Sequence, residues 1–542
     1  MNERLDWERA RFVSWPADRA DRYRAAGVWA GQTLFDALVE MLTDAIDDVA
    51  VIDDTESLSY GQLVDRAERL AGGLRTLGLA RGDAAVVQLP NTIDFVVTAL
   101  ACLRVGVRPV MALPALRLSE LDHLANTAEA AAVIVPSAWR EFDHEAMAHR
   151  LAADVDTVRS VVVTGTPRLR GSVAFADLVA NDVDRGPQPP ASDLALFLLS
   201  GGTTGRPKLI PRTHDDYLYN TRVSAEICKL TSNDRYLVAL PAGHNFPLGC
   251  PGIFGTLLSG GTVVMAASPE PAVALGAIER HGVTVTAAVP AVAQRWIDAA
   301  DDFPEVGSHW RLLQVGGSRL ADEIARLVEP RLGCRLQQVF GMAEGLLNFT
   351  RLDDPPQVVW TTQGRPASEH DEIRVLDGAG TPVADGQIGE LWTRGPYTIC
   401  GYFNADTHNH TTFADGWYRT GDLVRSGEGG NLVVEGRSKD QINRGGEKIS
   451  AEEIENVAYG LAAVEFCAAV AVPDADLGER VGLCVVLRPG TTLTMDDVRA
   501  HYDASDLARF KFPERLEFYD ALPLSNVGKV DKARLRADLA ER

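Results

Sequence analysis

Short apolar runs alternate with amphipathic helical stretches along the first half of the chain, and this alternation limits the fold more than any other feature. Between about Ala50 and Pro290, stretches such as LVDRAERLAGGLRTLGL have helical periodicity and separate runs with the composition of buried strands. These runs are AAVVQLP, AAVIVP, SVVVTG, LALFLLS, YLVALP, GTVVMA and TVTAAVP. Strands that alternate with helices form largely parallel sheets covered by helices. We therefore predict an α/β fold for this region.

The pattern changes after Pro366, where glycines separate the strand signals IRVLDGAGTPVADGQIGELWTRG and GNLVVEGR. Beyond them GRSKDQINRGGEKIS is polar and rich in glycine, as expected of a joint between domains, and a further mixed helix and strand pattern follows. A chain of 542 residues also exceeds one ordinary hydrophobic core. We predict an N-terminal core of α/β subdomains with a small β subregion over 1–436, a hinge over 437–440, and a small, mobile C-terminal α+β domain over 441–542.

Charge and cysteine usage exclude several classes of protein. The 75 acidic and 53 basic residues give a formal net charge of -22, which disfavours binding to nucleic acid or to anionic lipid. The charged N-terminus and the lack of a long apolar stretch predict neither secretion nor membrane insertion. Seven scattered cysteines without a CxxC spacing argue against a disulfide framework and a zinc site, so we expect a cytoplasmic protein.

The segment SGGTTGRPK follows the apolar run LALFLL directly and predicts a phosphate-binding loop. Glycine N–H groups and hydroxyls can surround phosphate oxygens, and a lysine supplies a mobile cation. Arginine and proline follow the last glycine, so the segment is not a Walker loop. A glycine- and threonine-rich surface turn is the alternative. The candidate phosphate-binding residues are Ser200, Gly201, Gly202, Thr203, Thr204, Gly205 and Lys208.

Two isolated acids stand next to glycine in strand-like segments. Glu344 in VFGMAEG could ligate Mg²⁺, which prefers oxygen ligands, or could be the N-terminal charge of a helix. Asp422 in YRTGD, read as following a Thr-Gly turn, could accept hydrogen bonds from ribose hydroxyls or could cap that turn. Each acid alone leaves both alternatives open.

Five segments together resemble the superfamily of adenylate-forming enzymes, which includes acyl-CoA synthetases, luciferases and the adenylation domains of non-ribosomal peptide synthetases. The segments are SGGTTGRPK, VFGMAEG, YRTGD, GRSKDQINRGGEKIS and PLSNVGKVDK, in the order and spacing of that superfamily over almost the whole chain. The resemblance implies that the phosphate loop holds ATP, that Glu344 assists Mg²⁺, and that Asp422 and Arg437 hold the ribose. It also implies that the walls of the adenine and acyl sites are Gly316, Gly317, Ser318, Val339, Phe340 and Gly341.

By the same resemblance, Lys529 contacts the α-phosphate and the substrate carboxylate during adenylation. An ammonium there offsets the repulsion of two anions and the charge of the transition state, although Lys529 could otherwise be a solvated basic residue. Lys439 matches the hinge position of the superfamily. The loop 443–449 matches the segment that enters the site for a second half-reaction, in which a phosphopantetheine thiol attacks the acyl carbonyl; its residues are Gly445, Gly446 and Lys448. The candidate catalytic residues are Lys529, Glu344, Lys208 and His244.

The segment GHNFPLGCPG resembles the aryl-acid ligases of siderophore assembly, as do WPADRADRYRAAGVWAGQTL and KLIPRTHDDY. The resemblance implies that Asn245 contacts the hydroxyl ortho to the carboxylate and that His244 and Phe246 flank the ring, with Gly317 beside it. Cys250 occupies the position at which dihydroxybenzoate ligases have a serine. Because a thiol is a weak hydrogen-bonding group, Cys250 together with Leu347 suits a ring that lacks a 3-hydroxyl. Alternatively, Cys250 is a buried core cysteine and His244 a satisfied interior histidine.

The expected function is therefore ATP-dependent adenylation of salicylate to salicyl-AMP and pyrophosphate. The salicyl group would then pass to the phosphopantetheine thiol of an aryl carrier protein on a separate synthetase polypeptide, in biosynthesis of a mycobactin-type siderophore. Within the subfamily the resemblance is greatest to the salicyl-AMP ligases of mycobactin assembly in mycobacteria. The alternatives are a 2,3-dihydroxybenzoate-AMP ligase, an aryl-CoA ligase that uses free coenzyme A, and a protein that binds adenylates without catalysis.

Overall fold

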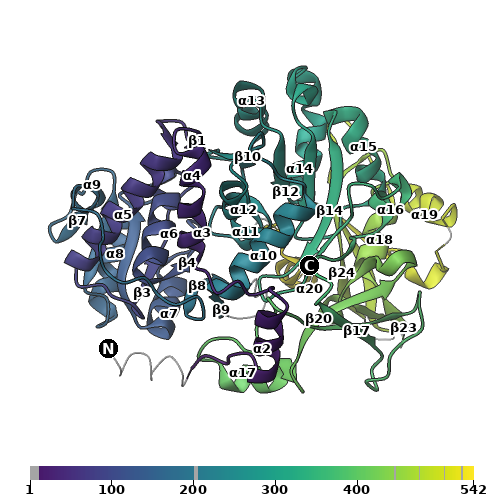
Figure 1. Ribbon diagram of the computed structural model, residues 1–542. Helices are drawn as coiled ribbons and strands as arrows, with labels where there is room; N and C mark the ends of the chain where they lie inside the picture. Colours follow the sequence, from purple (N-terminus) through teal and green to yellow (C-terminus); the bar gives the residue numbers. More distant parts are fainter. Residues whose placement is uncertain are drawn as a thin grey trace.

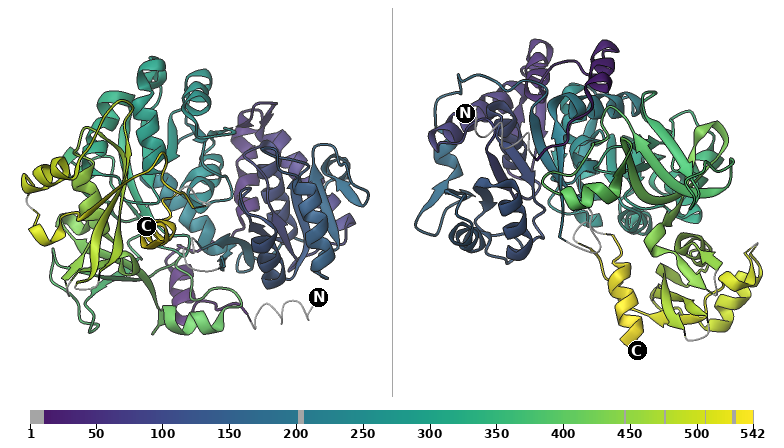
Figure 2. Two further views of the ribbon diagram at one scale, coloured as in Figure 1. Left: turned by 180° about the vertical axis from the view of Figure 1, so that it is seen from behind. Right: turned by 90° about the horizontal axis from the view of Figure 1, so that it is seen from below.

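The computed structural model describes residues 11–200, 206–444, 447–474, 477–505, 507–525 and 529–541, without the side chains of Lys439 and Lys448. The described residues form four sheets. Two large sheets and a smaller antiparallel sheet make up the larger body, and the residues after Asp440 form a small body that projects from it (Figures 1 and 2).

The first large sheet has the strand order β7-β6-β5-β3-β4-β8-β9. Its strands run parallel except for the antiparallel pair β8 and β9, whose connection contains the predicted phosphate loop. The bounds are β3 Ala84–Val87, β4 Arg108–Met111, β5 Ala130–Pro136, β6 Ser160–Thr164, β7 Ser172–Ala174, β8 Leu194–Leu199 and β9 Leu209–Thr213.

The second large sheet has the order β16-β15-β14-β13-β12-β10-β11-β1-β2 and is parallel from β14 to β1. The seven apolar runs form β3, β5, β6 and β8 in the first sheet and β10, β11 and β12 in the second. The predicted α/β fold is therefore confirmed. The bounds are β1 Val49–Ile52, β2 Ser57–Ser59, β10 Arg235–Val238, β11 Thr262–Met265, β12 Val285–Ala288, β13 Leu312–Gly316, β14 Arg335–Gly341, β15 Leu347–Phe349 and β16 Arg365–Pro366.

Helices cover both large sheets, and α5 and α6 lie between them (Figure 1). α6 is apolar on all sides, with nearly every side chain buried, as expected of a helix enclosed by other layers. The helices of the larger body are α2 Ala17–Ala25, α3 Leu34–Glu40, α4 Leu42–Ala45, α5 Tyr60–Thr76, α6 Ile93–Val105, α7 Leu118–Ala128, α8 His144–Asp154, α9 Phe175–Val179, α10 His214–Ile227, α11 Asn245–Gly249, α12 Gly252–Leu258, α13 Pro271–His281, α14 Pro290–Asp298, α15 Asp322–Leu332, α16 Pro356–Thr361 and α17 Asp406–Thr412.

The predicted β subregion is an antiparallel sheet of β17 Glu372–Leu376, β18 Ile388–Arg394, β19 Phe413–Ala414, β20 Trp417–Ser426 and β21 Leu432–Arg437. One interpretation of the sequence is wrong here, because YRTGD does not form a turn but lies within β20. Gly421 has a positive φ of 72°, the pairing of β20 with β18 shifts register between Arg419 and Leu423, and its pairing with β21 shifts just after Leu423. The Thr-Gly pair therefore marks an irregularity in a continuous strand.

The small body contains β22 Ile442–Arg444, β23 Glu447–Ile449, β24 Val464–Asp474, β25 Gly478–Leu487 and β26 Arg515–Phe518, with α18 Ala451–Ala458, α19 Met495–Asp503 and α20 Lys532–Glu541. Its sheet and helices bury two clusters of apolar side chains of their own. Polar contacts join it to the larger body: Ser450 donates to the Glu435 carbonyl at 2.6 Å, and Asn456 accepts from the Asp322 N–H at 3.0 Å. No helix within the described ranges is long and apolar enough to cross a membrane.

Candidate functional site

The site is built at the edge where the parallel strands β13 and β14 end. Gly316 closes β13 opposite Val339 of β14, so the segments that follow both strands leave the sheet side by side. A Cβ on Gly316 would lie 2.7 Å from the Val339 carbonyl oxygen and 3.1 Å from the Phe246 ring. Gly317 has a φ of 89°, a conformation that favours glycine. The two glycines thus allow the close approach of Val339 and Phe246, while Ser318 next to them is exposed.

Lys529 of the small body reaches this same edge. Its Cε lies 3.5 Å from the position of a Cβ on Gly317, so the lysine of the C-terminal motif is inserted against the glycine turn that follows β13. Burial lowers the pKa of Lys529 to about 8; the Arg437 guanidinium also lowers it, whereas Asp422 and Glu344 raise it. The sequence motif and the glycine turn, more than 200 residues apart, therefore meet in one site.

Asp422 and Arg437 face one another across neighbouring strands. They are directly paired in the ladder between β20 and β21, and the Arg437 Nε donates to the Asp422 carboxylate at 2.9 Å. Burial raises the pKa of Asp422, and the cations Arg437 and Lys529 oppose that rise. Asp422 caps no turn, because its strand continues through it. The pair presents one acceptor and one donor next to Lys529, which suits a polyhydroxylated ligand.

Glu344 lies in the loop between β14 and β15 and is nearly buried. No helix begins there, so the alternative of a helix N-terminal charge does not apply. The Tyr402 hydroxyl donates to its carboxylate at 2.7 Å, and the Ile399 N–H donates to its main-chain carbonyl at 2.8 Å. Among the described residues no group of three His, Cys, Asp or Glu side chains could hold a metal ion. A lone carboxylate nevertheless fits Mg²⁺, which protein sites often hold with one or two carboxylates and the phosphates of a substrate.

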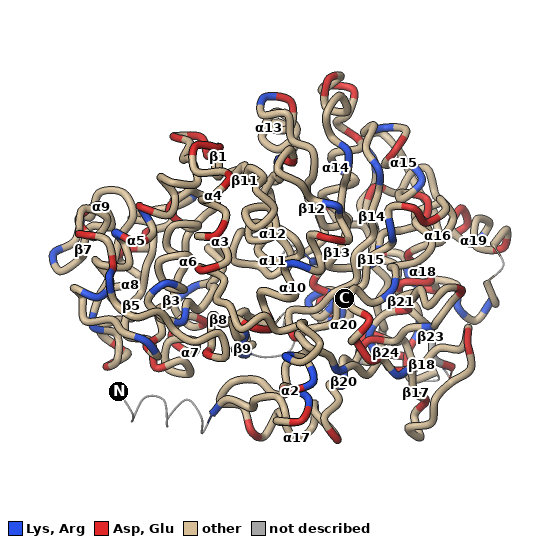
Figure 3. The backbone as a smooth tube through the Cα atoms, in the orientation of Figure 1, with Lys and Arg blue, Asp and Glu red and all other residues tan. Residues whose placement is uncertain are grey.

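The two described ends of the predicted phosphate loop are held together. The Ser200 N–H donates to the Lys208 carbonyl at 3.1 Å, and the Lys208 N–H donates to the Ser200 hydroxyl at 3.0 Å. The Lys208 ammonium lies 5.2 Å from the centre of the Tyr402 ring, whose hydroxyl contacts Glu344. Figure 3 shows acidic and basic residues interspersed in both bodies, so an anion at this loop would depend on local cations such as Lys208.

Several predicted residues lie outside what the structure describes. They are Gly201, Gly202, Thr203, Thr204 and Gly205 of the phosphate loop, Gly445 and Gly446 of the loop after the hinge, and the side chains of Lys439 and Lys448.

A buried polar cluster surrounds the start of α11. The Tyr217 hydroxyl donates to Asn245 Oδ1 at 2.8 Å, and Asn245 Nδ2 lies 3.3 Å from Cys250 Sγ. Asn220 also faces that sulfur, at 3.9 Å, and donates to the Gly249 carbonyl at 2.7 Å. Burial raises the pKa of Cys250 to about 12, so its thiol stays protonated at neutral pH. The bond from Tyr217 fixes which way the Asn245 amide points, and one amide hydrogen remains for a ligand.

His244 precedes this cluster, and its ring accepts a hydrogen bond from the Phe246 N–H at 3.3 Å. Burial and, to a smaller extent, the nearby Lys529 ammonium together lower the pKa of His244 to about 4, so the ring is neutral above pH 5. Leu347 of β15 is buried and paired with Gly341, where a Cβ would lie 2.5 Å from the leucine side chain. His244 is thus adjacent to Asn245 in the chain and close enough to Lys529 for the lysine charge to affect its pKa.

Sequence reasoning missed four residues that support the site: Tyr217, Asn220, Tyr402 and Arg212. Tyr217 and Asn220 are three residues apart on α10, a spacing that puts them on one helix face, and this was the available signal. Arg212 is fully buried, pairs with Asp216 at 2.6 Å, and donates to the Ala343 carbonyl beside Glu344 at 3.1 Å. Tyr402 carries no local signal, because only the tertiary fold brings it to Glu344.

Comparison with known proteins assigns most of the chain. Residues 41–403 match the family model described as AMP-binding enzyme, and residues 453–529 match that of the AMP-binding enzyme C-terminal domain. A Streptomyces protein named salicylyl-CoA synthase / salicylate adenylyltransferase is 55% identical, with 97% of each chain covered. The salicyl-AMP ligase / salicyl-S-ArCP synthetase of Mycobacterium tuberculosis is 48% identical over 96% of this chain and 93% of its own. The apo structure of Mycobacterium smegmatis MbtA superposes with a TM-score of 0.76 at 44% identity, covering 98% and 99% of the two chains.

Proposed function

This chain belongs to the family of AMP-binding enzymes, and we propose that it adenylates salicylate and then transfers the salicyl group to a thiol. The observation that carries the proposal is the position of Lys529, whose ammonium lies at the Gly317 turn beside Asp422, Arg437 and His244. ATP and a carboxylate are both anions, and an ammonium held at this position is the group needed to bring them together. Two relatives named for salicylate, at 55% and 48% identity, support the choice of acid.

In the first half-reaction a carboxylate oxygen attacks the α-phosphorus of ATP. A carboxylate–phosphorus bond forms, the bond between the α- and β-phosphates breaks, and pyrophosphate leaves. No general base is required, because the acid is already ionised at neutral pH. Lys529 contacts the α-phosphate and the carboxylate, Asp422 and Arg437 hold the ribose, and Ser200 and Lys208 flank the triphosphate. Glu344 would hold Mg²⁺ together with the phosphates, and the ion would neutralise their charge.

In the second half-reaction a thiol sulfur attacks the acyl carbonyl carbon. A carbon–sulfur bond forms, the carbon–oxygen bond to AMP breaks, and the thiol proton is released to solvent. We place the pivot between the two states at Lys439, in the hinge 437–440. This choice is supported by an ion pair at each end of the hinge. Arg437 pairs with Asp422 of the larger body, and Asp440 pairs with Arg536 of the small body at 3.0 Å. Ser438 and Lys439 are left between them.

The acid pocket suits salicylate because of how Asn245 is held. Tyr217 occupies one side of the amide oxygen and Cys250 Sγ faces the amide nitrogen, so the free amide hydrogen is placed for an oxygen ortho to the carboxylate. A buried protonated thiol hydrogen-bonds weakly and gives little recognition to a hydroxyl at the next ring position. Phe246 packs on the Gly316 turn and supplies an apolar wall.

Replacing Lys529 with alanine tests the proposed adenylation. We expect the rate of salicyl-AMP formation, followed by chromatography of quenched reactions, to fall about 10²–10³-fold, as for loss of one transition-state donor. The matched control is Lys511→Ala in the same small body, because Lys511 pairs with Glu453 at 2.7 Å and lies outside the site. Absence of salicyl-AMP with the natural chain would refute the proposed function, and a normal rate in Lys529→Ala would refute the role of Lys529.

The pH dependence of kcat/KM tests the role of Lys529 in a second way. The ammonium is the active form and is lost as pH rises through its pKa of about 8, so kcat/KM for ATP should fall on the alkaline side of that value. Lys529→Arg should shift the alkaline fall upward by more than one pH unit, because arginine stays protonated. An unchanged profile in that variant would contradict the assignment.

Cys250→Ser tests the choice between salicylate and 2,3-dihydroxybenzoate. A hydroxyl is a better hydrogen-bonding partner than a thiol, so we expect the ratio of kcat/KM for dihydroxybenzoate over salicylate to rise about tenfold. The control is Cys228→Ser, another fully buried cysteine, whose thiol donates to Gln337 at 3.2 Å. Equal ratios in the two variants would show that Cys250 is a core residue without a selective role.

We propose a carrier-bound phosphopantetheine as the acceptor thiol, within siderophore biosynthesis, as the name of the Mycobacterium tuberculosis relative supports. Free coenzyme A is the second candidate, because the Streptomyces relative is named a salicylyl-CoA synthase.

The two acceptors are separated by measuring kcat/KM for coenzyme A and for a phosphopantetheinylated aryl carrier domain with the same enzyme. We expect at least a hundredfold preference for the carrier, because it can bind the protein surface in addition to the thiol channel. Saturable turnover with coenzyme A and no transfer to the carrier would overturn this choice.

A further inference from the structure

The segment 11–33, here called the N-terminal strap, runs along the larger body and joins parts of the chain that are far apart in sequence. Its helix α2 and the helix α17 both lie at the lower edge of the larger body in Figure 1. The Asn404 N–H donates to the Arg11 carbonyl at 3.1 Å, and a Cβ on Gly401 would lie 2.8 Å from the Val13 side chain. One end of the strap is therefore fastened to the segment just before α17.

Two tryptophans of the strap attach it to the segment that begins at Gly395. The Trp15 indole N–H donates to the Gly395 carbonyl at 3.1 Å, and the Trp29 indole N–H donates to the adjacent Pro396 carbonyl at 3.0 Å. Both rings are buried and meet edge to face, with centroids 5.3 Å apart. Tyr23 packs on Trp29 at the same separation. Two consecutive carbonyls are thus held from one side by two rigid donors.

The segment held in this way, 395–402, supports Glu344 at both its main chain and its side chain. The Ile399 N–H donates to the Glu344 carbonyl, and the Tyr402 hydroxyl donates to its carboxylate. Thr398 packs so closely on Gly345 that a Cβ on the glycine would lie 2.4 Å from the Thr398 Cα. A shift of the segment would therefore move the Glu344 carboxylate.

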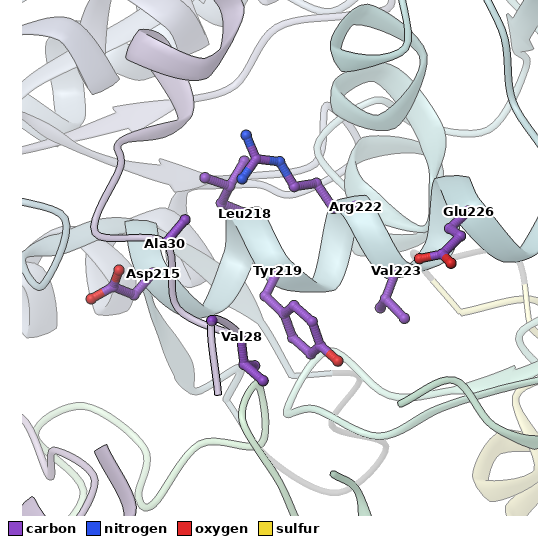
Figure 4. Close-up of a pocket in the computed structure, with 9 residues that line it drawn as sticks. Val28, Ala30, Asp215, Leu218, Tyr219, Arg222, Val223 and Glu226 are labelled. Atoms are coloured by element: carbon purple, nitrogen blue, oxygen red, sulfur yellow. The ribbon is translucent and has the colours of Figure 1, made fainter. Parts of the chain in front are cut away.

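The other end of the strap is fastened to α10, the helix of the aryl-acid pocket. The Gly31 N–H donates to the Asp215 carboxylate at 3.2 Å, and the Leu34 N–H, just past the strap, donates to the His214 ring at 3.4 Å. A cavity of about 220 Å³ separates Val28 and Ala30 from the outer face of α10 (Figure 4). The strap thus spans this cavity and is tied by hydrogen bonds to His214 and Asp215 at the start of α10, about one and a half turns before Asn220.

The strap also lies outside the part common to the wider family. The AMP-binding model begins at Met41, after the strap. The Streptomyces relative, by contrast, matches 97% of the chain, which leaves about 16 residues unmatched, fewer than the 40 residues before Met41. Part of this leading region is therefore shared with the salicylate relative and is absent from the general match.

We propose that the N-terminal strap is a positioning element that holds segment 395–402, and through it the Glu344 carboxylate, in fixed relation to the aryl-acid pocket on α10. This inference rests on the proposed function. Trp15 and Trp29 are its positioning residues, acting through the Gly395 and Pro396 carbonyls. Displacement of a positioned group by about 1 Å lowers a rate on the order of a hundredfold, so a partial loosening should be measurable.

The test is the double variant Trp15→Phe, Trp29→Phe, which keeps the aromatic packing and removes both indole donors. We expect kcat/KM for ATP to fall about tenfold while the Kd for salicylate changes less than twofold, because α10 keeps its own core contacts. In the free protein, hydrogen exchange of the 395–402 amides should become faster, with the Ile399 N–H the most informative. The matched control is Trp310→Phe, since the buried Trp310 indole donates to the Leu312 carbonyl at 3.0 Å, at the opposite end of β13 from Gly316.

The outcomes separate the two hypotheses. If the natural chain forms salicyl-AMP but the double variant matches Trp310→Phe in both kinetics and exchange, the strap inference is wrong and the proposed function stands. If the natural chain forms no salicyl-AMP, the proposed function fails, and faster exchange confined to 395–402 would still support the mechanical part of the inference. A uniform rise in exchange across the larger body would mean general destabilisation and would overturn it.

Discussion

The insertion of one ammonium into a buried site is the interaction on which the rest of this molecule depends. Lys529 lies on a different body from the strands whose ends form the site, and its Cε lies at van der Waals distance, 3.5 Å, from the position of a Cβ on Gly317. Burial disfavours its charge, while Asp422 and Glu344 favour it, so its pKa settles at about 8. Bound anions would stabilise the charge further. Burial lowers the pKa of His244, and the same ammonium adds to that effect, so the ring next to the proposed acid pocket is uncharged.

The contacts between the two bodies are polar, as expected of an interface that opens and closes when the small body carrying Lys529 rotates. They include main-chain and side-chain hydrogen bonds at Ser450 and Asn456 and an ion pair between Arg488 and Asp298 at 3.2 Å, whose side chains are partly exposed. The fully buried apolar clusters of the small body are separate from those of the larger one, while the partly buried Tyr459 packs against both. Separation at such a polar interface exposes little apolar surface, in keeping with the proposed rotation at Lys439 between half-reactions.

The sequence was most informative where a local pattern determines a local structure. Seven apolar runs became strands, because strand burial in a parallel sheet leaves a clear compositional mark. The two residues that the aryl-acid segment singled out, Asn245 and Cys250, lie 3.3 Å apart, and their roles toward the acid stay predictions. YRTGD was misread as a turn, since a glycine with positive φ inside a strand looks the same in sequence as a glycine in a turn. Tyr402 and the strap tryptophans could not be found this way, because their partners lie 58 and more than 360 residues away.

The central claim is that this site joins a carboxylate oxygen to the α-phosphorus of ATP. Tracing which product contains that oxygen tests this claim directly. Salicylate labelled with ¹⁸O in both carboxylate positions would be turned over with ATP and an acceptor thiol, and the AMP would be analysed by mass spectrometry. Formation of a salicyl adenylate followed by attack at the acyl carbon leaves one ¹⁸O in each AMP and none in pyrophosphate. AMP without label, or label in pyrophosphate or inorganic phosphate, would contradict the account.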